Sequence, residues 1–297
     1  MSKAPSTSPP VGETFEEYLK EAGFKPPTVY QHRKYASYFL AWMAEKSLDI
    51  AQITYTEILD FADHLKKENT NINLINRVML AVRYYFTYLQ NERQIGYNPA
   101  AGISLKGTIR TVPHDLLEKA DLETLYHNYE IKDERTHRNK VIIGLLVYQA
   151  LTREELETIR PEHLKLREGK ISVPKTGRQN DRILPLQPHQ ILDLQEYVLL
   201  IRPKLQHHSE RLFTGRDDLE NLQNTLLHLS HALKKINPKY KHAVQVRQSV
   251  ITEWLREKDL RTVQYMAGHR YVSSTERYQR LNLEDLKEAL SKHHPLR

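Results

Sequence analysis

Apolar residues recur at helical spacing along most of this chain, and one stretch carries the spacing of β-strands instead. Across residues 12–106 the apolar side chains return at i, i+3 or i+4, and i+7, which is typical of helices that pack on a core. Residues 170–174 and 182–186 form two short strand-like runs around the polar turn 176–181, which predicts a hairpin. The chain is therefore predicted to be mainly α-helical, with one small β-hairpin or sheet.

The N-terminal part is predicted to form a compact four-helix unit. Its first helix opens near Thr14, and Thr54 or Thr56 is a suitable N-cap for the second apolar face. Asn98 closes the unit, because the residue before a proline avoids the helical conformation. The apolar faces of the other three helices are Tyr35, Phe39, Trp42 and Met43, then Ile58, Phe61 and Leu65, and finally Ile75, Met79, Val82, Phe86 and Leu89.

Breaks in the helical pattern divide the chain into domains. The tail 1–11 is rich in Pro and Ser, lacks the apolar core of a signal peptide and is expected to be disordered. Residues 107–115 contain Gly and Pro without any periodicity, which favours an interdomain linker. We therefore expect an N-terminal domain over 12–106 and a mostly helical C-terminal domain over 116–297.

The positive charge is concentrated in the C-terminal part. The formal net charge is +7 with a pI near 9.3, and residues 1–106 contribute only +1 of that charge. A basic half favours an acidic partner such as nucleic acid. The chain has no cysteine, which excludes disulfides and thiolate metal sites, and no apolar run long enough to predict a transmembrane helix. We therefore expect a soluble protein of the cytoplasm.

Three residues near the C-terminus have side chains suited to chemistry on a phosphodiester. Tyr278 stands nine residues after His269, and Arg247 precedes both. A tyrosine is a nucleophile when it is positioned and the charge of its product is stabilised. The planar fork of an arginine binds two phosphate oxygens, and a histidine donates to another oxygen or manages a proton near neutral pH. Converging on one point, these groups would hold a phosphate and its developing charge.

Arg247, Gly268-His269 and Tyr278 resemble the C-terminal signature of the tyrosine recombinase/integrase family, in which the tyrosine attacks a DNA phosphodiester. The four-helix unit resembles the N-terminal core-binding (SAM-like) domain of the same phage-integrase-like and Xer-like recombinases. This resemblance implies two domains that close as a clamp around double-stranded DNA. The segments that carry it in the N-terminal unit are Phe15 to Leu19, Tyr38 to Trp42, and Asn76-Arg77 through Tyr85-Phe86 to Asn98-Pro99.

The resemblance implies a site-specific recombinase or integrase that cuts and rejoins DNA through a 3′-phosphotyrosine link, for a mobile genetic element. Tyr278 would be the nucleophile, and Arg247 and His269 would hold the scissile phosphate. Lys175 stands where the family has a hairpin lysine, which would give a proton to the leaving 5′-oxygen. A lysine that only keeps a strand edge soluble is the alternative. The family reaction implies no metal, no ATP and no other cofactor.

The first-arginine position departs from the family pattern. In the family an arginine is followed by two residues and then Glu-Leu, whereas this chain has Thr152 in strict register and Arg153 one place later. We predict that Arg153 fills this role, because a long side chain at the first position of a helix reaches sideways. Thr152 also forms a capping box with Glu155 at the head of a helix over 154–160. A surface arginine beside a helix cap therefore stays open as an alternative.

A second departure lies three residues before Arg247, where the family has a histidine and this chain has Val244. His242 is two residues out of register, and a substitute role for it is a hypothesis. Arg247 itself is predicted to open a helix over 247–255. Arg178 and Arg182, on the same hairpin as Lys175, are weaker catalytic candidates.

Further basic residues are predicted DNA contacts. Such residues neutralise phosphates and make the affinity for DNA fall as salt rises. A solvated charged face is the alternative for each of them. The predicted DNA-binding residues are Arg77, Arg83, Arg178, Lys239, Lys241 and His242.

The C-terminal tail carries an apolar stripe of three leucines, Leu283, Leu286 and Leu290. It packs on its own domain or, as in the family, on a neighbouring subunit. We expect a nucleoid-associated homo-oligomer on DNA, dimer to tetramer, without contact to membranes. Three other functions stay open. They are a recombinase-fold DNA-binding protein with lost or reduced cleavage, a type IB topoisomerase-like nicking and closing enzyme, and a basic helical scaffold that binds no DNA.

Overall fold

The computed structural model describes residues 13–103, 105, 115–177, 179–205, 209–214 and 222–279. By its internal contacts the chain divides into two compact units, 1–109 and 110–297, each with its own core. Several predictions fall on residues outside the described ones. These are the tail 1–11, the linker except Asp115, the DNA contact Arg178, and the stripe Leu283, Leu286 and Leu290.

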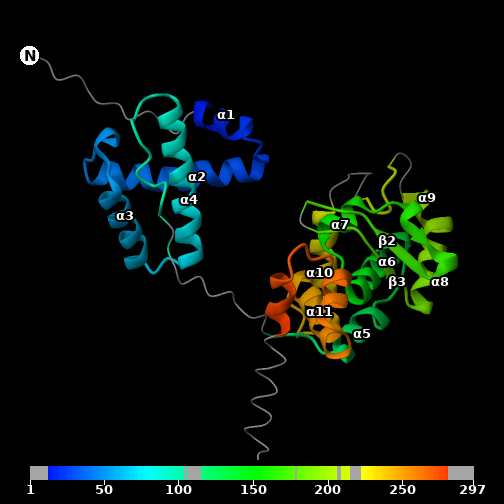
Figure 1. Ribbon diagram of the computed structural model, residues 1–297. Helices are drawn as coiled ribbons and strands as arrows, with labels where there is room; N and C mark the ends of the chain where they lie inside the picture. Colours follow the sequence, from blue (N-terminus) through cyan, green and yellow to red (C-terminus); the bar gives the residue numbers. More distant parts are fainter. Residues whose placement is uncertain are drawn as a thin grey trace, which may run out of the picture. The chain divides into compact units, whose positions relative to one another are not determined.

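The N-terminal unit is a four-helix domain in which the long helices α2 and α4 cross (Figure 1). Its core is rich in aromatic rings, and the ring of Phe39 lies 5.1 Å from Phe61 and 5.6 Å from Phe86 between centroids. The predicted apolar faces are confirmed, except that Tyr35 is only half-buried. The elements of this unit are α1 (Glu13–Glu21), α2 (Pro26–Glu45), η1 (Ile50–Gln52), α3 (Tyr55–Lys67) and α4 (Ile72–Asn91).

Local hydrogen bonds start α3 at a predicted N-cap and hold the segment around Asn98. Thr54 caps α3 in a capping box: its hydroxyl accepts from the backbone N–H of Thr56 at 3.2 Å, and its own N–H donates to Glu57 at 2.8 Å. After α4, the Asn98 amide donates to the carbonyl of Arg83 at 3.0 Å, so the segment that follows is held against α4.

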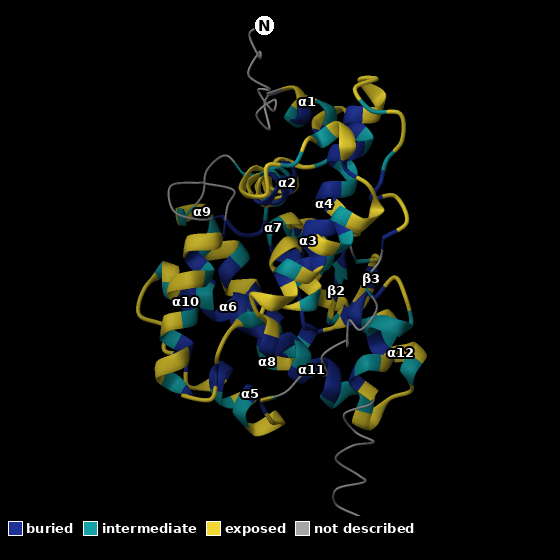
Figure 2. Ribbon diagram, turned by 90° about the vertical axis from the view of Figure 1, so that its left-hand side faces the viewer, coloured by how far each residue is buried: buried dark blue, intermediate teal, exposed yellow. Residues whose placement is uncertain are grey.

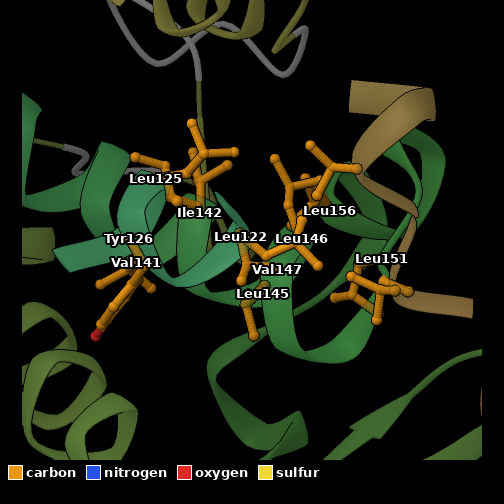
Figure 3. Packing of buried hydrophobic residues seen from close by; sticks show 14 of the residues in the cluster. Leu122, Leu125, Tyr126, Val141, Ile142, Leu145, Leu146, Val147, Leu151 and Leu156 are labelled. Atoms are coloured by element: carbon orange, nitrogen blue, oxygen red, sulfur yellow. The ribbon is translucent and has the colours of Figure 1, made fainter. Parts of the chain in front are cut away.

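The C-terminal unit is built around α6 (Glu134–Gln149), which is buried along most of its length (Figure 2). Its apolar side chains pack against α5 (Lys119–His127), where Leu122 and Leu125 meet Ile142 and Leu146 (Figure 3). The remaining helical elements are α7 (Arg153–Thr158), η2 (Pro161–His163), η3 (Leu166–Glu168), α8 (Pro188–Glu196), the π-helical turn η4 (Tyr197–Ile201), α9 (Arg202–Leu205), α10 (Gln223–Ile236), α11 (Ala243–Glu257) and α12 (Leu260–Ala267). Residues 273–279 are also helical.

The predicted hairpin is present as two strands of a small antiparallel sheet. β2 (Lys170–Val173) pairs with β3 (Arg182–Pro185), and Val173 lies opposite Arg182. A third strand, β1 (Leu164–Lys165), pairs with β2. Because β1 has only two residues, it carries no alternation that a sequence pattern could reveal. A single bridge between Gln179 and His269 joins the hairpin turn to the segment after α12, which brings the sheet to the predicted site.

Two predicted helix boundaries were wrong. The helix of Arg247 begins at Ala243 and not at Arg247, because His242 caps it: the ring Nδ1 accepts from the N–H of Gln245 at 3.0 Å. Helix α7 ends at Thr158 and not at residue 160. Arg160 precedes a proline and adopts extended backbone angles, as that position requires.

Candidate active site

Arg247 lies in the second turn of α11 with its side chain almost wholly buried. One terminal nitrogen, Nη1, donates to the carbonyl of Ala150, and the other, Nη2, donates to the carbonyl of Ala267 at 2.6 Å. Burial lowers the pKa of the guanidinium to about 10, and the carboxylate of Glu155 opposes that shift. Arg247 therefore stays charged at neutral pH, and its fork is fixed between the ends of α6 and α12.

His269 follows the end of α12, where Gly268 turns the chain with a φ of 67°. Its N–H donates to the carbonyl of Gln264 at 3.0 Å, and its ring Nδ1 lies 2.8 Å from the hydroxyl of Thr275. Burial, reinforced by the charge of Arg247, lowers the pKa of His269 to about 3. The imidazole is therefore neutral at physiological pH.

Tyr278 lies on the helical residues 273–279, and only 2% of it is exposed. Its ring is nearly parallel to that of His269, with 6.1 Å between centroids and 11° between planes. The phenolic oxygen accepts a hydrogen bond from Nη2 of Arg277 at 2.6 Å. The guanidinium of Arg277 also lies 4.7 Å from the centre of the Tyr278 ring. Arg247, His269 and Tyr278 thus belong to one buried cluster, drawn from three separate segments.

A buried ion pair that the sequence patterns did not predict lies beside this cluster. Nη1 of Arg182 donates to Oε1 of Glu155 at 2.5 Å, and both side chains are fully buried. Burial raises the pKa of Glu155, but the hydrogen bond and charge of Arg182 outweigh it, so the pKa is lowered overall. A sequence signal did exist, because Arg182 shares the inward face of β3 with Leu184 while Ile183 points outward.

Glu155 joins the helix cap to this ion pair. Its second oxygen, Oε2, accepts from the backbone N–H of Thr152 at 2.7 Å and from the Thr152 hydroxyl at 3.0 Å. The predicted capping box of α7 is therefore confirmed. Each oxygen of the carboxylate serves a different partner, so Thr152 and Arg182 are tied together through one side chain.

Arg153 and Lys175 are exposed on the C-terminal unit. Arg153 is the first residue of α7, and its Nε donates to Glu157 at 2.8 Å, one turn further along the helix. Lys175 follows the end of β2 and is exposed. The catalytic roles of both residues stay predictions.

The residues predicted to contact DNA occupy varied positions. Arg77 is exposed on α4, whereas Arg83 is half-buried and donates to the carbonyls of Ala100, at 3.2 Å, and Ile103. The two lysines form ion pairs, Lys239 with Asp121 at 3.1 Å and Lys241 with Asp115 at 2.6 Å. His242 is exposed beside the N-terminus of α11, which it caps, and Val244 is 60% exposed.

Among the described residues, no group of three or more His, Cys, Asp or Glu side chains is arranged to hold a metal ion. None of the described helices combines the length and the apolar character that a membrane span requires.

The chain matches two domain families in the order of its two units. The phage integrase family matches residues 115–285, more than half of the chain, and the N-terminal SAM-like domain of phage integrases matches residues 13–93. With the buried arginine, histidine and tyrosine cluster, these matches define an enzyme of the tyrosine recombinase class, which breaks and rejoins DNA. The chain belongs to the phage integrase family.

Its relatives include tyrosine recombinases that match along nearly their whole length. The tyrosine recombinase XerC of Oceanobacillus iheyensis is 26% identical, over 95% of each chain. The tyrosine recombinase XerD of Vibrio cholerae is also 26% identical, over 99% of each chain.

Solved structures share the fold at low sequence identity. The XerH site-specific recombinase bound to a palindromic difH substrate has a TM-score of 0.70 and 18% identity, covering 89% of this chain and 77% of that one. The Tn1549 transposon integrase in complex with a circular intermediate DNA has a TM-score of 0.64 and 15% identity, covering 94% of this chain and 100% of that one.

Proposed function

We propose that this protein is a site-specific recombinase of a mobile genetic element, and that Tyr278 is its nucleophile. The observation that supports this role is the buried cluster in which the ring of Tyr278 lies beside His269, near Arg247. The Tyr278 oxygen attacks the phosphorus, the bond to the 5′-oxygen breaks, and a 3′-phosphotyrosine link keeps the bond energy for rejoining. Membership of the phage integrase family agrees with this chemistry.

Arg247 and His269 bind the non-bridging oxygens of the scissile phosphate in this proposal. Arg247 uses two of its five N–H groups on the carbonyls of Ala150 and Ala267, which orients the others. His269 is neutral, and if its Nδ1 accepts from the Thr275 hydroxyl, its Nε2 carries the proton and donates to the phosphate. Both groups are fixed before DNA binds, so they stabilise the pentacoordinate state without reorganisation.

Lys175 is proposed as the general acid. It follows β2 in the hairpin whose turn is bridged to His269 through Gln179. Its exposed ammonium group has the freedom to approach DNA bound at the cluster, where it gives a proton to the leaving 5′-oxygen. No metal and no ATP enter this scheme.

Covalent trapping of the protein on DNA tests the function. DNA from both flanks of its own gene, nicked near candidate sites, is incubated with the wild-type chain, with Tyr278→Phe, and with Tyr271→Phe as an exposed control. We expect a protein–DNA band that resists denaturation in the wild type and in Tyr271→Phe and is absent in Tyr278→Phe.

The main alternative is a recombinase-fold protein that binds DNA with lost or reduced cleavage, and the observation in its favour is Thr152 at the first-arginine position. Salt-sensitive binding to DNA across the flanks, without any covalent band, would favour this alternative. A band that persists in Tyr278→Phe would refute Tyr278 as the nucleophile.

We also propose assembly of this chain on duplex DNA as a homo-oligomer, dimer to tetramer. A lambda integrase fragment of the same fold, with a TM-score of 0.59 and 14% identity, is a dimer bound to a core site. Light scattering with and without the flank DNA that gives the covalent band should show more than one protomer per DNA site. A single protomer per site at saturation would contradict the proposal.

A further inference from the structure

We propose that Arg182 supplies the guanidinium missing at the first-arginine position, and that it binds a non-bridging oxygen of the scissile phosphate. The proposal rests on the proposed cleavage function and adds a residue to its machinery. Arg182 lies on β3, whereas the family pattern would place the arginine at the position of Thr152, at the head of α7.

Arg182 and Arg247 are anchored to consecutive residues. Nε of Arg182 donates to the carbonyl of Met266 at 2.7 Å, and Nη2 of Arg247 donates to the carbonyl of Ala267 at 2.6 Å. Since neighbouring Cα atoms are about 3.8 Å apart, both guanidinium groups lie against the last turn of α12, directly before Gly268-His269.

The close packing around Gly268 supports this position of the guanidinium. A Cβ on Gly268 would stand 2.6 Å from Nη1 of Arg182, so the chain needs a glycine where Arg182 passes it. The N–H of Asn180 donates to the carbonyl of Gly268 at 2.9 Å, which ties the hairpin to the same point. Arg182 is thus held against the residue that precedes His269.

One nitrogen of Arg182 has no partner among the described residues. Nη1 pairs with Glu155 and Nε with Met266, whereas Nη2 is buried and makes no hydrogen bond within the described residues. A buried donor without a partner is unfavourable, and an anionic ligand that reaches it removes that cost. Two further buried atoms in this region lack a partner in the part of the chain that the structure describes, the hydroxyl of Thr176 in the hairpin and Nε of Arg277 beside Tyr278.

The charge of the cluster also favours an anion. Arg182, Arg247 and Arg277 each act on the ionisation of His269, so all three lie within electrostatic range of its ring. Glu155 forms an ion pair with Arg182 and also acts on the charge of Arg247. The three arginines and Glu155 together carry a net charge of +2. A phosphodiester in the pentacoordinate state carries more negative charge than in the ground state, and fixed positive charge therefore stabilises it.

A purely structural role for Arg182 accounts for only part of its geometry. The ion pair of Nη1 with Glu155 joins β3 to α7, and the hydrogen bond of Nε to Met266 joins β3 to α12. Neither interaction explains why Nη2 is buried without a partner among the described residues. Arg153, the rival for the first-arginine role, is exposed and pairs with Glu157 along its own helix. The two arginines can be separated by experiment.

The test compares Glu155→Gln with the double variant Glu155→Gln/Arg182→Met. Neither variant leaves an unpaired buried carboxylate, and the two differ only in the guanidinium. Each is assayed for covalent complex formation on DNA with an ordinary scissile phosphodiester, and on DNA with a methylphosphonate that replaces one charged oxygen by a methyl group. Arg153→Gln is assayed in parallel.

We expect the double variant to react about 100- to 1,000-fold more slowly than Glu155→Gln on the phosphodiester, as for loss of one oxyanion donor. On the methylphosphonate the two variants should react within a few-fold of each other, because the charge that Arg182 neutralises has been removed. Equal rates on the phosphodiester, or an unchanged deficit on the methylphosphonate, would overturn the proposal.

A second measurement applies if the wild-type chain forms no covalent band on any DNA. The midpoint of thermal unfolding is measured in inorganic phosphate and in chloride of equal ionic strength. We expect phosphate to raise the midpoint of Glu155→Gln and Arg153→Gln but not that of the double variant. The missing band would count against the cleavage function, and this thermal result would keep an anion site at Arg182. An equal effect on all three variants, or none on any, would overturn the anion site as well.

Discussion

The guanidinium of Arg277 caps the hydroxyl of Tyr278: Nη2 donates to the phenolic oxygen at 2.6 Å, from a residue adjacent in the chain. The same guanidinium lies 4.7 Å from the centre of the Tyr278 ring. The attacking oxygen is therefore oriented before DNA arrives, by a cation that remains beside it as it loses its proton.

Replacing Arg277 by leucine should slow covalent complex formation by about 10- to 100-fold, since a hydrogen bond to a charged group contributes about 1.5–3 kcal/mol. Arg277→Lys should recover part of the rate. Single-turnover assays on nicked DNA measure the effect, with Arg270→Leu as the control for loss of an exposed neighbouring cation. An unchanged rate in Arg277→Leu would show that the contact does not assist the nucleophile.

Lys175→Ala should slow cleavage of an ordinary phosphodiester by about 100- to 10,000-fold, the usual contribution of general acid catalysis. With sulfur in place of the bridging 5′-oxygen, the variant should approach the wild-type rate, because a thiolate leaves without a proton. Lys170→Ala, an exposed lysine of the same hairpin, is the control. A deficit of equal size on both substrates would argue against Lys175 as the acid.

Stability should fall in acid partly because of His269. In the unfolded chain a histidine takes up a proton near pH 6.5, whereas burial keeps the pKa of His269 at about 3 in the folded chain. Between these values the unfolded state binds more protons, so the free energy of unfolding decreases as the pH falls from about 6.5 towards 3.

His269→Gln should therefore lose about 2 kcal/mol less stability than the wild type between pH 7 and about pH 4.5. Urea unfolding at the two pH values measures the difference. His228→Gln, which removes an exposed histidine of α10, should behave as the wild type does. If His269→Gln also shows the wild-type acid dependence, His269 is not held neutral.

Gly268→Ala should destabilise the C-terminal unit by more than Gly169→Ala. Both glycines have positive φ, 67° and 63°, which costs an alanine about 1–2 kcal/mol. A Cβ at Gly169 meets only Ile191 at 3.6 Å, whereas at Gly268 it would stand 2.6 Å from Nη1 of Arg182. Denaturant unfolding of both variants isolates the steric part, and equal losses of stability would contradict the close approach of Arg182.

Arg77 and Arg83 should respond differently to substitution. Arg77→Gln should reduce the slope of log affinity against log salt by about 1, because one phosphate contact is lost. Arg83→Gln should instead destabilise the N-terminal unit by about 1–3 kcal/mol, since Arg83 donates to the carbonyls of Ala100 and Ile103. Titrations of DNA binding across a salt series, together with urea unfolding, distinguish the two effects. The assignments would be reversed if Arg77→Gln unfolded more easily and Arg83→Gln kept its stability.

Local features of the fold could be predicted from the sequence. The apolar faces of α2, α3 and α4 follow from spacing within one helix, and the capping boxes at Thr54 and Thr152 follow from residues three positions apart. The start of α11 was misplaced, because a histidine is an uncommon cap and its ring reaches the N–H of Gln245 only in the folded geometry.

The helices of the N-terminal unit, the hairpin and the family signature of Arg247, His269 and Tyr278 could be read from the sequence, because each depends on residue types at short, regular spacing. Which cations surround that signature depends on how distant segments of the chain pack. Arg182 meets a carboxylate 27 positions earlier and a carbonyl 84 positions later, and no periodicity links positions so far apart. Such contacts arise only when the sheet, α7 and α12 pack together, since a buried charged or polar group is stable mainly where it meets a partner.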